Sequence, residues 1–232
     1  MSIQFVKAEV NGNDFIIIED PPLTAQKVVK LSDRRTGIGA DQIIVFSRRL
    51  VDHAYDVLFF NSDGSTADMC GNGLIALTQY FGDSHKKKYF VGNREYEGFI
   101  AKDGYCCIVS PRPVVIRKEK WGKFIDTGNK HIVCISNNPS VFSFHNEYNI
   151  HFVEKIDNNT LRVKTYERGA GFTPACGSGA IASAYAYGNP GGINHIIHEN
   201  GGKSIVDLSN SNVAILRARA SIVFNGECIV TG

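Results

Sequence analysis

Two cysteines occupy equivalent places in a motif that occurs twice. Cys70 and Cys176 each begin the pattern Cys-Gly-(Asn or Ser)-Gly, and an apolar run with helical character follows each one. A cysteine at the start of a helix lies beside unpaired backbone N–H groups and the positive end of the helix dipole, which favour the thiolate. The other four cysteines lie in apolar, strand-like runs, as small buried side chains do: Cys106, Cys107, Cys134 and Cys228. The motif therefore predicts two reactive thiols.

The residues that follow each cysteine could bind a carboxylate. Glycine at these positions lets a ligand approach the backbone closely, and helix N-termini bind anions. The candidate donors are the backbone N–H groups of Gly71, Asn72, Gly177 and Ser178. If the two thiols face one carbon, one can remove a proton while the other returns a proton to the opposite face. Converging N–H groups would stabilise the carbanion. We therefore expect inversion of a stereocentre beside a carboxylate, in a reaction where no residue needs to form a covalent bond with the substrate.

The spacing of the two motifs indicates two halves. They lie 106 residues apart, which is a domain-sized period. Helices are expected at residues 23–31, with Thr24 as N-cap, at 71–80 and at 177–187. We expect an α+β fold of two pseudo-symmetric halves, each a curved mixed β-sheet around a central helix. The alternative is that two short patterns match by chance and that both cysteines only fill the core.

Most other elements are expected to be short strands. The candidates are β-branched or aromatic runs bounded by Gly, Asn, Asp or Pro. They span residues 3–10, 14–19, 43–46, 54–60, 96–102, 105–110, 132–136, 149–154, 160–165, 203–208, 213–219 and 222–230. Pro111 and Pro113 would interrupt strand pairing, so the halves are placed at 1–111 and 112–220.

Composition excludes several classes of protein. The chain has 232 residues, with 25 Lys and Arg against 23 Asp and Glu, and so offers no broad basic face for nucleic acid. Lys86-Lys87-Lys88 is interpreted as a solvated turn rather than a binding patch. No apolar run approaches the roughly 18 residues of a membrane span, and the N-terminus does not resemble a signal peptide. Scattered histidines and the absence of a CxxC pair predict no metal site. We expect a cytoplasmic protein without nucleic-acid or membrane partners.

Five segments resemble, in order, the signatures of the diaminopimelate epimerase family. They are Asn-Gly-Asn-Asp-Phe at 11–15, Arg-Thr-Gly-Ile-Gly-Ala-Asp-Gln at 35–42, Asn-Ser-Asp-Gly-Ser-Thr-Ala-Asp-Met-Cys-Gly-Asn-Gly at 61–73, Tyr-Glu-Arg-Gly-Ala-Gly at 166–171 and Ala-Cys-Gly-Ser-Gly-Ala at 175–180. Weaker similarity continues to the end of the chain. The resemblance implies a cofactor-independent amino-acid epimerase that is a homodimer. It also implies two pseudo-symmetric α/β halves, with a final strand at about 221–232 that returns to the first half.

The resemblance also implies a role for each matching residue. Cys70 and Cys176 would be the acid/base thiols, exchanging roles with the direction of the reaction. His131 and Glu167 match positions thought to tune the pKa values of these thiols. The backbone N–H groups named above would hold the carboxylate at the reacting centre. Of the other substrate-binding positions, Asn13 and Gln42 would line the site, and Glu167 would contact the reacting amino group. The distal amino-acid end would be held by Asn61, Asn129, Asn149 and Arg168.

The chain departs from the family pattern near the distal end of the substrate. Lys130 stands where the family has proline, Phe172 where it has glutamate, and Ile75 where it has arginine. The stretch 132–148, which normally helps to frame the distal pocket, is shorter than usual. These changes leave the reacting centre intact. They bear on the substrate, because loss of one paired polar contact can change selectivity by on the order of a few kcal/mol.

The leading hypothesis is interconversion of LL- and meso-2,6-diaminopimelate, which feeds lysine and peptidoglycan synthesis. One alternative is a related racemase for another amino acid, such as histidine, or an isomerase of the same fold. A pyridoxal-dependent racemase would need a Schiff-base lysine, and no lysine stands in a matching context. A binding protein of the same fold would not need two thiols. A redox role for the thiol pair is treated as a liability that abolishes activity.

Overall fold

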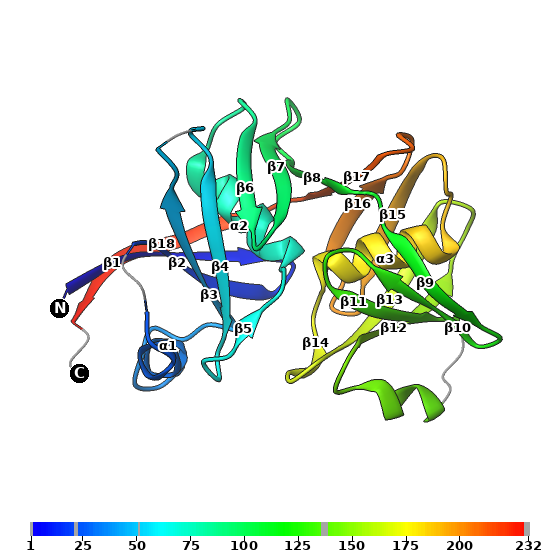
Figure 1. Cartoon of the computed structure of the whole chain (residues 1–232), viewed down its shortest axis with the longest axis horizontal. Coiled ribbons are helices and arrows are strands. Elements are labelled where there is room, and N and C mark those ends of the chain that lie inside the picture. Colours follow the sequence, from blue (N-terminus) through cyan, green and yellow to red (C-terminus); the bar gives the residue numbers. More distant parts are fainter. Residues whose placement is uncertain (1, 21–22, 51, 136–138, 230–232) are drawn as a thin grey trace. The chain divides into compact units, whose positions relative to one another are not determined.

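The structure is a computed structural model that describes residues 2–20, 23–50, 52–135 and 139–229. The chain divides into two compact units, one made of Met1–Cys107 with Arg219–Gly232 and the other of Ile108–Ala218 (Figure 1). Residues 136 and 230, where two expected strands were to end, lie outside the described residues, as does the end of the returning segment from 230 onward. No helix in the described part of the chain is long and apolar enough to cross a membrane.

The first unit is a mixed β-sheet around helix α2 (Gly71–Phe81). Its strands are β1 (Ser2–Val10), β2 (Asn13–Glu19), β3 (Gln42–Arg48), β4 (Tyr55–Asn61), β5 (Thr66–Ala67), β6 (Lys87–Val91), β7 (Arg94–Ile100) and β18 (Ser221–Ile229). Helix α1 (Ala25–Ser32) begins after Thr24, whose side chain accepts a hydrogen bond from the Lys27 N–H at 3.4 Å and thereby confirms it as the N-cap. Figure 1 shows the last strand, β18, lying beside the first, β1.

The second unit surrounds helix α3 (Gly177–Tyr187) in the same way. Strand β8 (Cys106–Pro111) leads into it from the first unit. Its other strands and its 3₁₀ helix are β9 (Val114–Glu119), β10 (Gly122–Asp126), β11 (Lys130–Cys134), η1 (Pro139–Phe144), β12 (Asn149–Lys155), β13 (Thr160–Glu167), β14 (Gly171–Thr173), β15 (Ile193–His198), β16 (Lys203–Asp207) and β17 (Val213–Ala218).

Strand pairing follows the same order and direction in both units. In the first unit the antiparallel pairs are β18–β1, β1–β2 and β3–β4. The parallel pairs are β2–β3 and β4–β6. In the second unit the antiparallel pairs are β9–β10, β10–β11 and β12–β13. The parallel pairs are β11–β12 and β13–β15. Each series continues with an antiparallel strand, β7 and β16 respectively. The internal repeat expected from the two cysteine motifs is thus a repeat of the whole sheet.

Both central helices are buried on most sides, which explains their composition. In α2 the first eight residues are buried, and in α3 nine of eleven residues are buried. A helix that is apolar all round belongs in a core, because no face of it is suited to water. Ile75 is completely buried, so this departure from the family pattern places an aliphatic side chain in the core of the first unit.

The lysine run differs from the expectation. Lys87 and Lys88 lie in strand β6, so the prediction of a turn is wrong. Each lysine of the run pairs with an acidic side chain: Lys86 with Glu97 at 2.7 Å, Lys87 with Asp83 at 3.1 Å, and Lys88 with Glu95 at 2.8 Å. Two of these acids lie in β7, the neighbouring strand. The run therefore forms ion pairs, two of them with acids of the neighbouring strand, and is not an open basic patch.

Candidate active site

Cys70 is the N-cap of α2. Its backbone is extended, with φ −130° and ψ 110°, and its Sγ accepts a hydrogen bond from the Gly73 N–H at 3.3 Å. Gly73 allows the helix to lie directly on strand β4, because a Cβ at this position would come within 2.5 Å of the Phe59 ring. The first turn of the helix, with Gly71 and Asn72, is buried beside the sulfur. The sulfur therefore lies among backbone N–H groups that stabilise negative charge.

Cys176 is the N-cap of α3 with nearly identical geometry. Its φ is −130° and its ψ is 116°, and its Sγ accepts a hydrogen bond from the Gly179 N–H at 3.3 Å. The Ser178 hydroxyl lies 3.4 Å from the same sulfur. Gly177 and Ser178 are buried, as are their counterparts in the first unit. The two units thus present the same arrangement of a thiol at a helix N-terminus.

In the first unit, three of the expected site residues lie at one end of the sheet. Asn13 begins β2, two residues before Phe15, which pairs with Gln42 at the start of β3. Gln42 in turn pairs with Asn61 at the end of β4. The Gln42 Nε2 donates to the Asn61 Oδ1 at 2.9 Å. The Gln42 Oε1 is buried and has no hydrogen-bond partner among the described residues, so it can accept a hydrogen bond from a ligand.

The second unit repeats this arrangement with different side chains. Asn129 lies two residues before His131, which pairs with Asn149 at the start of β12. Asn149 lies one step beyond the pair of residues 150 and 166, which places it opposite Glu167 at the end of β13. The equivalent positions are therefore Asn13 and Asn129, Phe15 and His131, Gln42 and Asn149, Asn61 and Glu167, and Cys70 and Cys176.

Hydrogen bonds hold the polar residues of the second unit in place. The Asn149 Oδ1 accepts from the Arg168 N–H at 2.9 Å, and the Asn149 Nδ2 donates to the Lys130 carbonyl at 3.5 Å. The Thr173 hydroxyl donates to the Glu167 Oε1 at 2.6 Å, which ties the β13–β14 hairpin together just before Cys176. The Arg168 side chain is exposed. Asn129, Asn149, Glu167 and Arg168 thus lie on neighbouring loops and strand ends of the second unit.

His131 belongs to a buried hydrogen-bonded chain that runs behind Cys176. Its Nε2 lies 3.0 Å from the Thr127 hydroxyl, and its Nδ1 lies 2.9 Å from the Nε2 of His151. The His151 Nδ1 lies 3.2 Å from the Thr165 hydroxyl. Burial lowers the pKa of His131 to about 3, and burial together with the nearby His131 and His198 places the pKa of His151 well below its ordinary value. Both imidazoles are therefore neutral at neutral pH.

Three members of this series of hydrogen-bonded side chains were not expected from the sequence: His151, Thr127 and Thr165. His151 lies in an expected strand, at a position that alternates with Asn149 and Val153 on the same face. That alternation is the signal that could have identified it, because Asn149 was already expected at the site. Its imidazole also lies directly against the start of α3, since a Cβ at Gly179 would come within 2.1 Å of the ring.

A network of charges fixes the loop that carries Asn13. The Asn13 Nδ2 donates to the Asp41 Oδ2 at 2.9 Å, and the Asp41 N–H donates to the Asp14 Oδ1 at 2.9 Å. Asp14 also accepts two hydrogen bonds from the Arg34 guanidinium, both at 2.8 Å, and one from the Lys7 ammonium at 2.6 Å. Burial alone would raise the pKa of Asp14. The hydrogen bonds from Arg34 and Lys7 outweigh burial and hold that pKa well below its ordinary value of 3.8.

We expect Asp14→Asn to lower the free energy of unfolding at neutral pH by about 1 to 3 kcal/mol, because it leaves the Lys7 ammonium without its carboxylate. A depressed carboxyl pKa stabilises the fold above the unfolded pKa, and that stabilisation is lost as the pH falls through the folded pKa. The deficit of the variant should therefore shrink below pH 3.8. Denaturant unfolding at neutral and acid pH, with Asp20→Asn at an exposed position as control, measures it. An equal deficit at both pH values would contradict the assignment.

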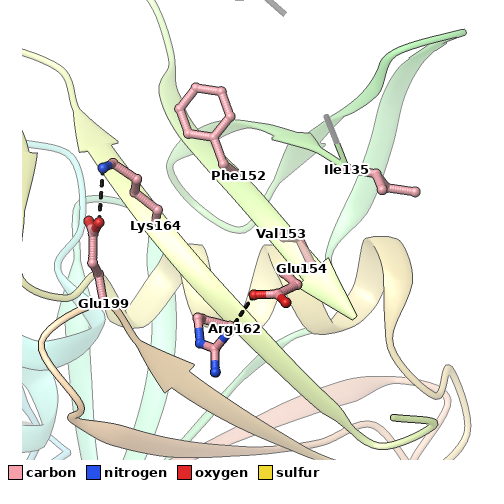
Figure 2. A pocket seen from close by; sticks show the side chains of 7 residues that line it. All are labelled: Ile135, Phe152, Val153, Glu154, Arg162, Lys164 and Glu199. Atoms are coloured by element: carbon pink, nitrogen blue, oxygen red, sulfur yellow. Dashed lines mark hydrogen bonds and ion pairs between the residues drawn. The ribbon is translucent and has the colours of Figure 1, made fainter. Parts of the chain in front are cut away.

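The groove in Figure 2 lies apart from the expected site residues. It has a volume of about 270 Å³ and belongs to the second unit. Its lining residues are Ile135, Phe152, Val153, Glu154, Arg162, Lys164 and Glu199. Figure 2 shows that the charged side chains pair with one another, Arg162 with Glu154 and Lys164 with Glu199. None of the residues expected at the site lines this groove.

Comparison with known proteins identifies the relatives of this chain. The family model described as diaminopimelate epimerase matches residues 5–93 and 140–221. The diaminopimelate epimerase of Vesicomyosocius okutanii is 27% identical over 271 residues, covering 98% of this chain and 99% of that protein. The diaminopimelate epimerase of Cyanothece sp. is 28% identical over 235 residues, covering 80% of this chain and 84% of the other. The matches thus extend over nearly the full length of such enzymes.

Solved structures share the fold at low identity. A protein from Pseudomonas aeruginosa, described as a predicted epimerase, has a TM-score of 0.74 and 11% identity, covering 99% of this chain and 100% of that one. A hydroxyproline epimerase from Agrobacterium vitis has a TM-score of 0.69 and 11% identity, covering 97% and 92% respectively. These likenesses confirm the expected fold class of curved mixed sheets around central helices.

Proposed function

The chain belongs to the diaminopimelate epimerase family, and from this membership we propose that it interconverts LL- and meso-2,6-diaminopimelate. It is an isomerase of the superfamily of epimerases that work without pyridoxal phosphate. The observation that best supports the proposal is the pair of cysteine-capped helices. In both, the cysteine sulfur accepts a hydrogen bond, at 3.3 Å, from the backbone N–H of the residue three positions later. The φ and ψ angles of the two capping cysteines agree within a few degrees.

The proposed reaction uses two bases. One cysteine, as the thiolate, removes the proton from the α-carbon, and the other, as the thiol, delivers its proton to the opposite face. The substrate gains and loses one proton in each turnover, so no net proton is taken up or released. After turnover the protonation states of Cys70 and Cys176 are exchanged. Charge that develops beside the carboxylate would be stabilised by the N–H groups of the two helix N-termini, at Gly71, Asn72, Gly177 and Ser178. No cofactor is needed in this scheme.

The polar residues of both units would hold the rest of the substrate. The unpartnered, buried Oε1 of Gln42 is suited to accept from an ammonium group, and Asn13 lies beside it at the same sheet end. We assign Asn61, Asn129, Asn149 and Arg168 to the distal amino-acid end, and Glu167 to the reacting amino group. The Glu167 carboxylate already accepts one hydrogen bond, from Thr173, and has remaining acceptor capacity. His131 and Glu167 would tune the pKa values of the thiols.

The direct test is incubation of the protein with LL-diaminopimelate in heavy water, while stereochemistry and deuterium content are followed together. We expect meso-diaminopimelate to appear with deuterium at the inverted α-carbon. Exchange and inversion should begin without added cofactor. If neither deuterium nor the second stereoisomer appears at micromolar enzyme, the proposed function is wrong.

A second candidate function is racemisation of a different amino acid. Phe172, which stands where the family has glutamate, is 55% exposed and packs edge-on against Tyr166 at 5.2 Å. Lys130 is also exposed, at the start of β11. On the proposed assignment of the distal end, both changes would alter its surroundings while the two cysteines are retained. The same heavy-water assay with a panel that includes L-histidine and trans-4-hydroxy-L-proline separates the two candidates.

We also propose that the protein is a homodimer that associates through strand β18. Three consecutive apolar side chains of this strand are exposed: Ile222 by 43%, Val223 by 56% and Phe224 by 47%. Phe224 meets Phe5 edge-on at 5.9 Å, and a shift of register opposite Lys7 and Ala8 interrupts the alternation of side chains between Ile222 and Phe224. Exposed apolar residues gathered on one strand are typical of an interface between subunits.

Ile222→Lys is expected to weaken dimerisation at least about tenfold, because it buries a charge in an apolar contact. Light scattering coupled to size-exclusion chromatography, over a range of protein concentrations, measures the change. Val114→Lys is the matched control, since Val114 is 61% exposed on β9, the strand of the second unit that corresponds to β18. A wild-type protein that is monomeric at all concentrations, or equal effects of both variants, would contradict the proposal.

The cytoplasm is the proposed location of the enzyme. All six cysteines are free thiols in the structure, and the two-base reaction requires Cys70 and Cys176 to remain reduced. A reducing compartment keeps them so.

A further inference from the structure

The layer of side chains beneath the central helix differs in kind between the two units. In the first unit it is apolar and consists of Phe15, Ile44 and Phe59, which are at most 1% exposed. The corresponding positions of the second unit hold His131, His151 and Thr165, which are at most 2% exposed. The equivalence follows from the strand register, because residue 44 pairs with 59 as residue 151 pairs with 165. The fold therefore does not require histidines in this layer.

The two imidazoles and the Cys176 thiol form a compact cluster of metal-ligand atoms. One ligand atom from each of His131, His151 and Cys176 lies within 4.8 Å of the other two. All three residues are buried, and within the described ranges no other group of three His, Cys, Asp or Glu side chains is so arranged. Two imidazoles and a thiolate are ligands that Zn²⁺ prefers, and three protein ligands leave a fourth position open.

Each imidazole has one nitrogen that faces the other ring and one that faces a threonine hydroxyl. The Nδ1 of His131 and the Nε2 of His151 face each other at 2.9 Å. The outward nitrogens of the two rings lie 3.0 Å from the Thr127 hydroxyl and 3.2 Å from the Thr165 hydroxyl. A histidine that binds a metal typically donates its other N–H to an oxygen, which fixes both tautomer and orientation. The two threonines can play this part without moving.

The spacing of the two facing nitrogens is close to what a zinc ion needs. Two ligand nitrogens of a tetrahedral zinc ion are about 3.3 Å apart, so the facing nitrogens need to separate by only a few tenths of an ångström. A cation would therefore occupy the place of the hydrogen that the two rings share.

We propose that His131, His151 and Cys176 bind one thiophilic divalent cation, such as Zn²⁺, and that the bound cation inhibits the enzyme. On binding, the shared hydrogen moves to an outward ring nitrogen, where a threonine oxygen accepts it. The Cys176 thiol gives up its proton to solvent as the Zn–S bond forms, so one proton is released per cation. The inhibition rests on the proposed function, because a sulfur bound to zinc cannot exchange a proton with the substrate. The binding itself does not rest on that function.

Binding is measured directly with the full-length protein. We expect one Zn²⁺ per chain in competition with a chromophoric chelator. Co²⁺ at the same place should give a thiolate-to-metal charge-transfer band, which reports a Co–S bond. A chain that binds no Zn²⁺ at micromolar metal, or a Co²⁺ complex without the thiolate band, would overturn the proposal.

The repeat supplies matched controls. Cys176→Ser should remove the charge-transfer band and weaken binding more than about 100-fold, because loss of even an indirect partner costs about 10- to 100-fold. Cys70→Ser should bind as the wild type does, since its helix lies on an apolar layer. His151→Asn should weaken binding as Cys176→Ser does, whereas His195→Asn, at an exposed position of β15, should not. Equal behaviour of the two cysteine variants would overturn the proposal even if His151→Asn fails to fold.

The metal site and the proposed function can fail separately. If Zn²⁺ binds with the expected pattern of variants but no substrate is epimerised, the site stands and the function is wrong. If the metal-free protein epimerises its substrate but Zn²⁺ neither binds nor inhibits, the function stands and the metal site is wrong. When both hold, inhibition should follow Zn²⁺ occupancy and be reversed by a chelator.

Discussion

Replacement of either Cys70 or Cys176 by alanine is expected to lower kcat/KM for inversion by about 10²- to 10⁴-fold, the usual contribution of a general acid or base. Each thiol handles the proton on one face of the α-carbon, so neither can substitute for the other. The measurement is the rate at which the second stereoisomer forms in heavy water. Cys228→Ala is the control, because this partly buried cysteine lies in β18 and not at a helix N-terminus.

Hydrogen exchange in the two single variants gives a second, more specific test of the two-base mechanism. With one thiol removed, the remaining thiol can still take a proton from the stereoisomer whose hydrogen faces it and return a deuteron to the same face. We therefore expect slow loss of the α-hydrogen from one stereoisomer without inversion, and the opposite stereoisomer should be the substrate for the other variant. Inversion within tenfold of the wild-type rate in either variant would contradict the two-base mechanism.

Gly179→Ala is expected to destabilise the second unit by about 1 to 3 kcal/mol or more, the cost of overfilling a packed core. The new methyl would lie within 2.1 to 2.6 Å of three atoms of the His151 ring. That ring cannot withdraw easily, because both of its nitrogens are hydrogen-bonded and the residue is fully buried. Denaturant unfolding followed by a probe in the second unit measures the loss.

Gly191→Ala is the matched control, because a Cβ at Gly191 would meet no atom within 4 Å. Its effect should remain within about 0.5 kcal/mol. A double variant tests the cause directly, since a smaller residue at position 151 removes the clash. Gly179→Ala should then cost less in a His151→Asn background than in the wild type. Full additivity of the two changes would contradict the packing explanation.

The sequence predicted the central helices better than the outer strands. Both cysteine-capped helices begin one residue after the expected cap, because the cap, the glycines and the apolar run all favour the same start. Strand β6 was missed because its lysines suggest a solvated turn, and only pairing with β7 supplies the acidic partners. Strand β9 is exposed along most of its length and so lacks the alternation that identifies a strand. The domain boundary at residues 111 and 112 stays a prediction, while the contacts divide the chain after Cys107.

The candidate site could be predicted only where a motif is local in sequence. Cys70, Cys176 and the glycines that follow them are contiguous, so their chemistry is readable from spacing alone. His151 depends on the register between β11, β12 and β13, which no local pattern contains. The roles of His131 and Glu167 stay predictions, although the structure places His131 in the layer behind Cys176. The likeness of the two units is what makes the histidine layer recognisable as an exception.

The return of β18 to β1 has a consequence for biosynthesis. The second unit is one continuous segment that ends at Ala218, so all its strands have been translated before β18. The first unit begins at the N-terminus, yet its opening strand pairs with the last one, with residue 2 opposite residue 229. On the ribosome, the half that is synthesised first is therefore completed last. Until β18 has been synthesised, β1 has an unpaired edge, which is open to association with other nascent chains.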